Sequence, residues 1–241
     1  MSSKAIIWDF DGTLVLHKGL WSGTMLAALD ASINNHNLTI DKLKPYLQSG
    51  FPWHEPEKAH PELSQHGAWW AKMEKHFEDI YTDLGFDKNV SIALSKKTHE
   101  IYVDEKRYEI FPKTIETLYK LKRSGWFNVI LSNHVPELPD IVEKLGFFEV
   151  VEACFSSASI GYEKPNVKAF QFVIDYLHHP NMCVMVGDSI TADIEGANKA
   201  GINSILLHTK TNKPISNQCE SIDKIEYFLR HITSKNKSIE L

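Results

Sequence analysis

Short apolar runs alternate with helix-like segments along most of this chain, and that alternation restricts the folds open to it. The runs cover residues 5–8, 127–131, 183–186 and 204–207, with a weaker one at 150–155. An unbroken apolar run of this length is typical of a strand buried on both faces, as in a parallel sheet.

Segments with helical spacing separate these runs. They cover residues 114–122, 138–145, 166–177 and 192–200. Pro165 opens the third of them, at a first helical position where its missing N–H costs nothing. Strands that alternate with helices of this length predict an α/β fold with a doubly wound parallel sheet.

A long insertion interrupts the alternation after the first strand. Three of its stretches have helical spacing: residues 20–34, 67–84 and 90–105. Residues 50–61 are too rich in proline for regular structure. We therefore expect residues 1–16 and 108–241 to form an α/β core, and residues 17–107 to fold as a small helical domain.

The composition is that of an ordinary globular protein. Of the 241 residues, 43% are hydrophobic and 24% charged, and the net charge of −5 gives no support to binding of a nucleic-acid polymer. Neither a signal peptide nor a membrane-spanning run is apparent, so we expect a cytoplasmic protein without a membrane partner. Cys154, Cys183 and Cys219 are too few and too far apart for a disulfide framework. A monomer and a homodimer both stay open.

Polar and charged residues gather where the predicted strands end. The carboxyl ends of parallel strands meet at one edge of the sheet, where ligands bind. The side chains expected at that edge are those of Asp9, Asp11, Ser132, Asn133, His134, Lys164, Asp188 and Asp193.

These residue types have two complementary needs. Carboxylates that crowd together need a cation, and Mg²⁺ prefers hard oxygen ligands and leaves room for a substrate phosphate. Ser132, the backbone amides after it and Lys164 supply hydrogen-bond donors and a positive charge, which a phosphate needs. A carboxylate beside a phosphoryl group can attack it, and a second carboxyl can protonate the leaving oxygen.

Four motifs in this order resemble the haloacid dehalogenase-like hydrolase superfamily. They are DFDGTL at residues 9–14, LSN at 131–133, EKP at 163–165 and VGDSITAD at 186–193. The resemblance extends over the whole chain, and it also accounts for the insertion, because many members carry a helical cap after the first strand.

The resemblance implies a role for each residue in these motifs. Asp9 is expected to be the nucleophile and a Mg²⁺ ligand, and Asp11 the general acid and base, with its backbone carbonyl on the metal. Ser132, Asn133 and Lys164 are expected to bind the phosphoryl group. Asp188 is expected to bind the metal directly, and Asp193 to orient it, although a direct metal role for Asp193 stays open.

The expected activity is a Mg²⁺-dependent phosphatase that hydrolyses a small phosphorylated metabolite through an aspartyl phosphate. A sugar phosphate, a phosphoglycolate-like acid and a nucleotide monophosphate all fit. A phosphomutase, a 2-haloacid dehalogenase and a non-enzymatic phospho-aspartate signalling module are the alternatives. Trp53, in the proline-rich stretch, is a possible specificity residue, and His134 is expected at the edge of the pocket.

Overall fold

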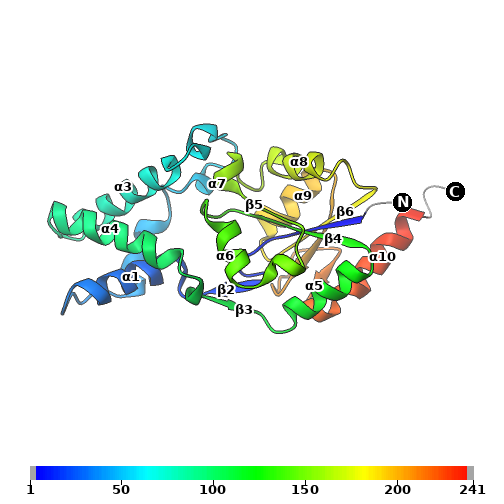
Figure 1. The fold of residues 1–241 in the computed structure, drawn as a ribbon, viewed down its shortest axis with the longest axis horizontal. Coiled ribbons are helices and arrows are strands. Elements are labelled where there is room, and N and C mark those ends of the chain that lie inside the picture. Colours follow the sequence, from blue (N-terminus) through cyan, green and yellow to red (C-terminus); the bar gives the residue numbers. More distant parts are fainter. Residues whose placement is uncertain (1–3, 238–241) are drawn as a thin grey trace.

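A six-stranded sheet forms the centre of the molecule in the computed structural model, which describes residues 4–237, with side chains described through residue 234 (Figure 1). Its order is β5-β4-β1-β6-β7-β8, and all neighbouring strands are parallel. The strands are β1 (Lys4–Trp8), β4 (Trp126–Ser132), β5 (Ala153–Ser156), β6 (Met182–Gly187), β7 (Asn203–Leu207) and β8 (Gln218–Cys219). The predicted α/β class is therefore confirmed. Strand β5 begins three residues after the start of the weak apolar run at 150–155, and β8 was not predicted.

Helices cover both faces of this sheet, as Figure 1 shows. They are α5 (Thr114–Arg123), α6 (Leu138–Lys144), α7 (Ser157–Ile160), α8 (Val167–Tyr176), α9 (Gly196–Lys199) and α10 (Ile225–Lys237). Alternate residues of β1 point into two separate cores: Ile6 and Trp8 lie in one, and Ile7 lies in the other with Phe170 of α8. This two-sided burial explains why β1 is apolar from Ala5 to Trp8.

Two predicted helices start differently. The Lys164–Pro165 peptide is cis, Asn166 caps α8 through Lys168 N, and the helix begins at Val167, so Pro165 precedes the helix and does not open it. The helix predicted at 192–200 begins as a π-helix at Ile190–Glu195 and becomes α-helical only at α9. Such wide turns occur often at functional sites.

The insertion is mostly helical. It contains α1 (Leu20–Ser32), α2 (Ile40–Leu43), α3 (Ala68–Asp83) and α4 (Lys88–Tyr102), and both α1 and α3 pack against α4. Short 3₁₀ turns occur within it at Lys44–Leu47, Pro52–His54, Pro61–Ser64 and Glu105–Arg107. Two more lie outside it, at Phe147–Glu149 and Ile222–Lys224. Among the described residues, none of the helices has both the length and the apolar character needed to cross a bilayer.

A two-stranded antiparallel sheet lies where the chain enters the insertion and where it returns to the core. Its strands are β2 (Val15–His17) and β3 (Tyr108–Ile110). The predicted boundary between residues 16 and 17 falls inside β2, and the one between residues 107 and 108 coincides with the start of β3. The division into a core and a cap domain stays a prediction.

His17, the last residue of β2, is buried. Its ring stacks on Tyr102 at 4.6 Å between centroids and meets the edge of Tyr108 at 4.7 Å. Burial lowers the pKa of His17 to about 4, and the charge of Asp11 offsets only part of that effect.

The buried His17 predicts a loss of stability in mild acid. Below pH 6.5 the unfolded chain takes up a proton at His17, whereas the folded chain takes it up only near pH 4. The free energy of unfolding therefore falls as the pH is lowered through this range. Between pH 7 and pH 5, the free energy of unfolding of the wild type should fall by about 2 kcal/mol more than that of His17→Gln. Urea titrations at both pH values measure this difference. The exposed His231→Gln serves as the control, and parallel pH dependence of wild type and His17→Gln would contradict the prediction.

Candidate active site

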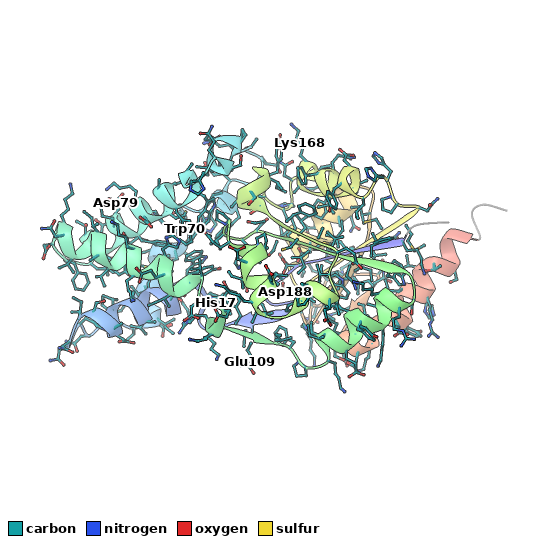
Figure 2. The ribbon with its side chains drawn as sticks, viewed as in Figure 1. His17, Trp70, Asp79, Glu109, Lys168 and Asp188 are labelled. Carbon is teal, nitrogen blue, oxygen red and sulfur yellow. The ribbon has the colours of Figure 1, made fainter. Side chains whose placement is uncertain are left out.

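Three neighbouring strands bring the predicted residues to one edge of the sheet. Residue Trp8 of β1 pairs with Ile130 of β4 and with Val186 of β6, so the ends of these strands lie level. Asp9 and Asp188 follow β1 and β6, and Ser132 ends β4. Figure 2 shows Asp188 near the middle of the molecule, with His17 between it and the helices of the insertion in this view.

Asp9 lies at the centre of this edge and is only 7% exposed. Its Oδ1 accepts hydrogen bonds from the Ser132 hydroxyl at 3.0 Å and from Lys164 Nζ at 2.8 Å. Its Oδ2 accepts a hydrogen bond from the Thr13 hydroxyl at 3.2 Å. The carboxylate is thus held in one orientation by three donors.

Lys164 joins two of the aspartates. Its ammonium is buried and donates to Asp193 Oδ1 at 2.6 Å as well as to Asp9. Burial alone would lower the pKa of Lys164, but the carboxylates of Asp193 and Asp9 outweigh burial and raise that pKa above its usual value. The lysine therefore carries a positive charge in the interior of the site.

Asn133 has a different contact from the one expected. Its amide side chain donates to the Lys164 carbonyl at 2.8 Å and accepts from the Lys164 backbone N–H at 2.7 Å. This pair of bonds fixes the backbone that carries the lysine. Binding of a phosphoryl group by Asn133 stays a prediction.

Three carboxylates form a group that could hold a metal ion. One oxygen each of Asp9, Asp188 and Asp193 lies within 4.8 Å of the others. Burial and the nearby charges of Asp9 and Asp193 raise the pKa of Asp188 to about 7. Such crowding of buried anions favours a cation beside them.

The two oxygens of Asp193 are already occupied. One accepts from Lys164, and the other accepts from the Ser189 backbone N–H at 3.0 Å. A side chain on Gly187 would collide with this carboxylate, and one on Gly12 would collide with that of Asp188. These contacts hold Asp193 against Lys164 and Ser189, and its orienting role and a direct metal role both stay predictions.

Asp11 stands beside this group, and its environment differs. Its Oδ2 lies 3.4 Å from His134 Nε2, and its Oδ1 is buried without a hydrogen-bond partner among the described residues. His134 is fully buried next to Asp11, so the structure places it closer to the chemistry than the edge of the pocket.

Thr13 was missed as a site residue. Its hydroxyl lies 3.2 Å from Asp9 and 3.4 Å from Asp188, and the residue is fully buried. A signal was present in the sequence, because Thr13 is part of the DFDGTL segment.

Trp53 is not brought into contact with these residues. Its half-buried ring stacks on Phe51 at 4.6 Å and lies 6.4 Å from both Trp21 and Trp69. Trp69 and Trp70 are both buried, and Trp70 Nε1 donates to the Glu137 carboxylate at 2.8 Å and 3.0 Å. The contact between Trp70 and Glu137 links α3 to the residue that precedes α6.

Comparison with known proteins agrees with this geometry. Residues 3–201 match the family model described as haloacid dehalogenase-like hydrolase. The glyceraldehyde 3-phosphate phosphatase of Methanothermobacter thermautotrophicus is 29% identical over 86% of each chain. The (S)-2-haloacid dehalogenase 4A of Burkholderia cepacia is 32% identical, over 45% of this chain and 48% of its own.

The solved structures show the same fold. A 2-haloacid dehalogenase from Pseudomonas syringae matches with a TM-score of 0.67 and 18% identity, covering 95% of this chain and 99% of its own. The family match extends over most of the sequence and includes all four motifs. The chain therefore belongs to the haloacid dehalogenase-like hydrolase family and is an enzyme of that class.

Proposed function

We propose that this enzyme is a Mg²⁺-dependent phosphatase that hydrolyses a small phosphorylated metabolite through an aspartyl phosphate on Asp9. The observation that carries the proposal is the position of the Asp9 carboxylate, which lies between the donors of Ser132 and Lys164 and beside Asp188. Donors around a carboxylate at strand ends can hold a phosphoryl group next to a nucleophile.

Each residue has a defined part in the reaction. Lys164 and Ser132 bind oxygens of the phosphoryl group and keep Asp9 aimed at phosphorus. Asp9 attacks, the bond from phosphorus to the ester oxygen breaks, and Asp11 gives that oxygen a proton. Asp11 then takes a proton from water, which attacks the aspartyl phosphate and releases inorganic phosphate.

A magnesium ion fits the residues of this site. Asp9, Asp188 and the Asp11 carbonyl would hold it, and Asp193 would orient Asp188 and Lys164 from behind. When bound, Mg²⁺ supplies a positive charge that neutralises phosphate oxygens.

Asp11 separates this function from dehalogenation. A halide leaving group needs no proton, whereas an alkoxide does, and Asp11, two residues after the nucleophile, is the carboxyl group that would give this proton. A phosphomutase would use the same residues and transfer the phosphoryl group to a second hydroxyl, so release of inorganic phosphate is the deciding product.

The insertion limits the size of the substrate. Hydrogen bonds join it to the core at Trp70–Glu137, His60–Gly161 and Pro56–Asn166. We infer that residues 17–107 cover the site as a cap, which favours small molecules over folded phosphoproteins. The names of the relatives, among them glyceraldehyde 3-phosphate phosphatase and phosphoglycolate phosphatase, support this substrate class.

Asp9→Asn should abolish the activity. The amide keeps the shape of the side chain but removes the nucleophile, so phosphate release from a panel of phosphorylated metabolites should fall by about 1,000-fold or more. Activity should also disappear in EDTA and return with Mg²⁺. Asp175→Asn, on the exposed side of α8, is the matched control and should behave as wild type. Full activity of Asp9→Asn, or of the wild type in EDTA, would overturn the mechanism.

Lys164 and Asp193 should depend on each other for stability. Removing one partner of a buried ion pair costs about 3–5 kcal/mol, so Lys164→Met and Asp193→Asn should each destabilise strongly. The double variant should be less destabilised than the sum of the two by about 2 kcal/mol, while activity stays lost. Denaturant unfolding in EDTA measures this coupling. The exposed pair of Lys75 and Asp79 is the control, and additive effects at Lys164 and Asp193 would contradict the account.

Trp53 is the residue we propose for substrate selection. Trp53→Ala should change KM values and the order of preferred metabolites, because an aromatic side chain from the cap is removed. Trp53→Phe should keep most of the original order, since it preserves the stack on Phe51. An unchanged order of substrates in Trp53→Ala would exclude this role.

A further inference from the structure

The proposed function leaves His134 without a role, although this buried side chain contacts Asp11. Its Nε2 lies 3.4 Å from Asp11 Oδ2 and 3.3 Å from the Tyr108 hydroxyl. The histidine is 1% exposed, and its backbone is fixed on both sides. Its N–H donates to Ser157 Oγ at 3.2 Å, and its carbonyl accepts from Ser156 Oγ at 2.6 Å.

The hydrogen bonds of Tyr108 decide which nitrogen of His134 carries hydrogen. The Tyr108 hydroxyl donates to the Tyr102 carbonyl at 3.1 Å, and a carbonyl oxygen can only accept. A phenol has a single proton, so its contact with His134 exists at the same time only if Nε2 is the donor. Nε2–H therefore donates to the Tyr108 oxygen, and Asp11 Oδ2 lies 3.4 Å from the same nitrogen.

The other ring nitrogen agrees with this assignment. His134 Nδ1 is buried and has no hydrogen-bond partner among the described residues. If Nδ1 carries no hydrogen, no buried N–H donor is left without an acceptor.

The two oxygens of Asp11 lie in different surroundings. Oδ2 is 3.4 Å from the nitrogen that carries hydrogen, so the polar N–H attracts its negative charge. Oδ1 is buried without a hydrogen-bond partner in the described part of the chain. A general acid works best when it is held in one orientation toward the reacting group.

We propose that His134, held by Tyr108, is a positioning residue that anchors the carboxyl group of Asp11 for proton transfer through its contact with Oδ2. This inference rests on the proposed phosphatase function. In the first half-reaction a bond forms between Asp9 and phosphorus, and the bond from phosphorus to the ester oxygen breaks. Its electron pair stays on the ester oxygen, which takes the proton of the Asp11 carboxyl group, and Asp11 is left as a carboxylate.

The dependence on the leaving group tests this role. An alkyl phosphate needs a proton from Asp11 as its alcohol departs, whereas 4-nitrophenyl phosphate releases a stable phenolate and needs much less help. The ratio of the two kcat/KM values therefore reports how well Asp11 is positioned, because kcat/KM excludes the later hydrolysis of the aspartyl phosphate. The alkyl probe is the fastest substrate among glycerol 3-phosphate, glyceraldehyde 3-phosphate and 2-phosphoglycolate.

Three substitutions separate the anchor from the packing of the ring. His134→Leu should lower kcat/KM for the alkyl phosphate by about 100-fold, and that for 4-nitrophenyl phosphate by less than about 10-fold. The amide nitrogen of His134→Gln can reach the place of Nε2 and should restore most of the loss. His134→Asn is equally polar but too short, and it should resemble His134→Leu.

The outcomes separate this role from the function itself. If His134→Leu does not fold, as judged by thermal unfolding, the contrast between His134→Gln and His134→Asn still decides. His231→Leu, on the exposed side of α10, is the control and should keep the wild-type ratio. An unchanged ratio of the two kcat/KM values in all three variants would overturn the positioning role. An equal loss on both substrates without rescue by His134→Gln would overturn it too. In either case the proposed function itself would stand as long as Asp9→Asn is inactive. A wild type that hydrolyses none of the probes would overturn the function as well.

Discussion

The buried charge of Lys164 is the interaction on which the rest of the site depends. An isolated ammonium would be costly to bury, but this one is bonded to Asp9 at 2.8 Å and to Asp193 at 2.6 Å. Its backbone is fixed in turn by the side chain of Asn133. The positive charge of Lys164 thus joins the segments that carry Asp9 and Asp193, which are far apart in the sequence. A displacement of Lys164 would leave both carboxylates without this partner.

The order of the sheet makes this arrangement possible. Because β1 lies between β4 and β6, the residues that follow these strands converge on one edge. Gly12 and Gly187 leave the space that the carboxylates of Asp188 and Asp193 occupy. Around His134 the surroundings are aromatic, with the ring centroids of Tyr102 and Tyr108 at 5.6 Å and 6.0 Å from that of His134. The electrostatic side holds the phosphoryl group in our account, and the aromatic side fixes the acid.

Much of the fold could be predicted because its signals are local. Apolar runs and helical periodicity found the main strands, and the polar residues after them marked the edge where the site lies. The rest depends on contacts that spacing does not encode. The amide of Asn133 bonds to the backbone of Lys164, 31 positions away, and His134 reaches Asp11 only because β4 lies beside β1. Strand β8, only Gln218–Cys219, is too short to give a periodic signal.

Passage of the phosphoryl group through Asp9 can be tested by trapping the aspartyl phosphate. The enzyme is mixed with substrate and Mg²⁺, quenched in acid during turnover, digested and mapped by mass spectrometry. We expect one phosphorylated peptide, with the modification on Asp9 and lost on treatment with hydroxylamine. A phosphoryl group on another residue would contradict this mechanism. In Asp11→Asn, where discharge of the intermediate is slowed, turnover without any phosphorylated peptide would contradict it as well.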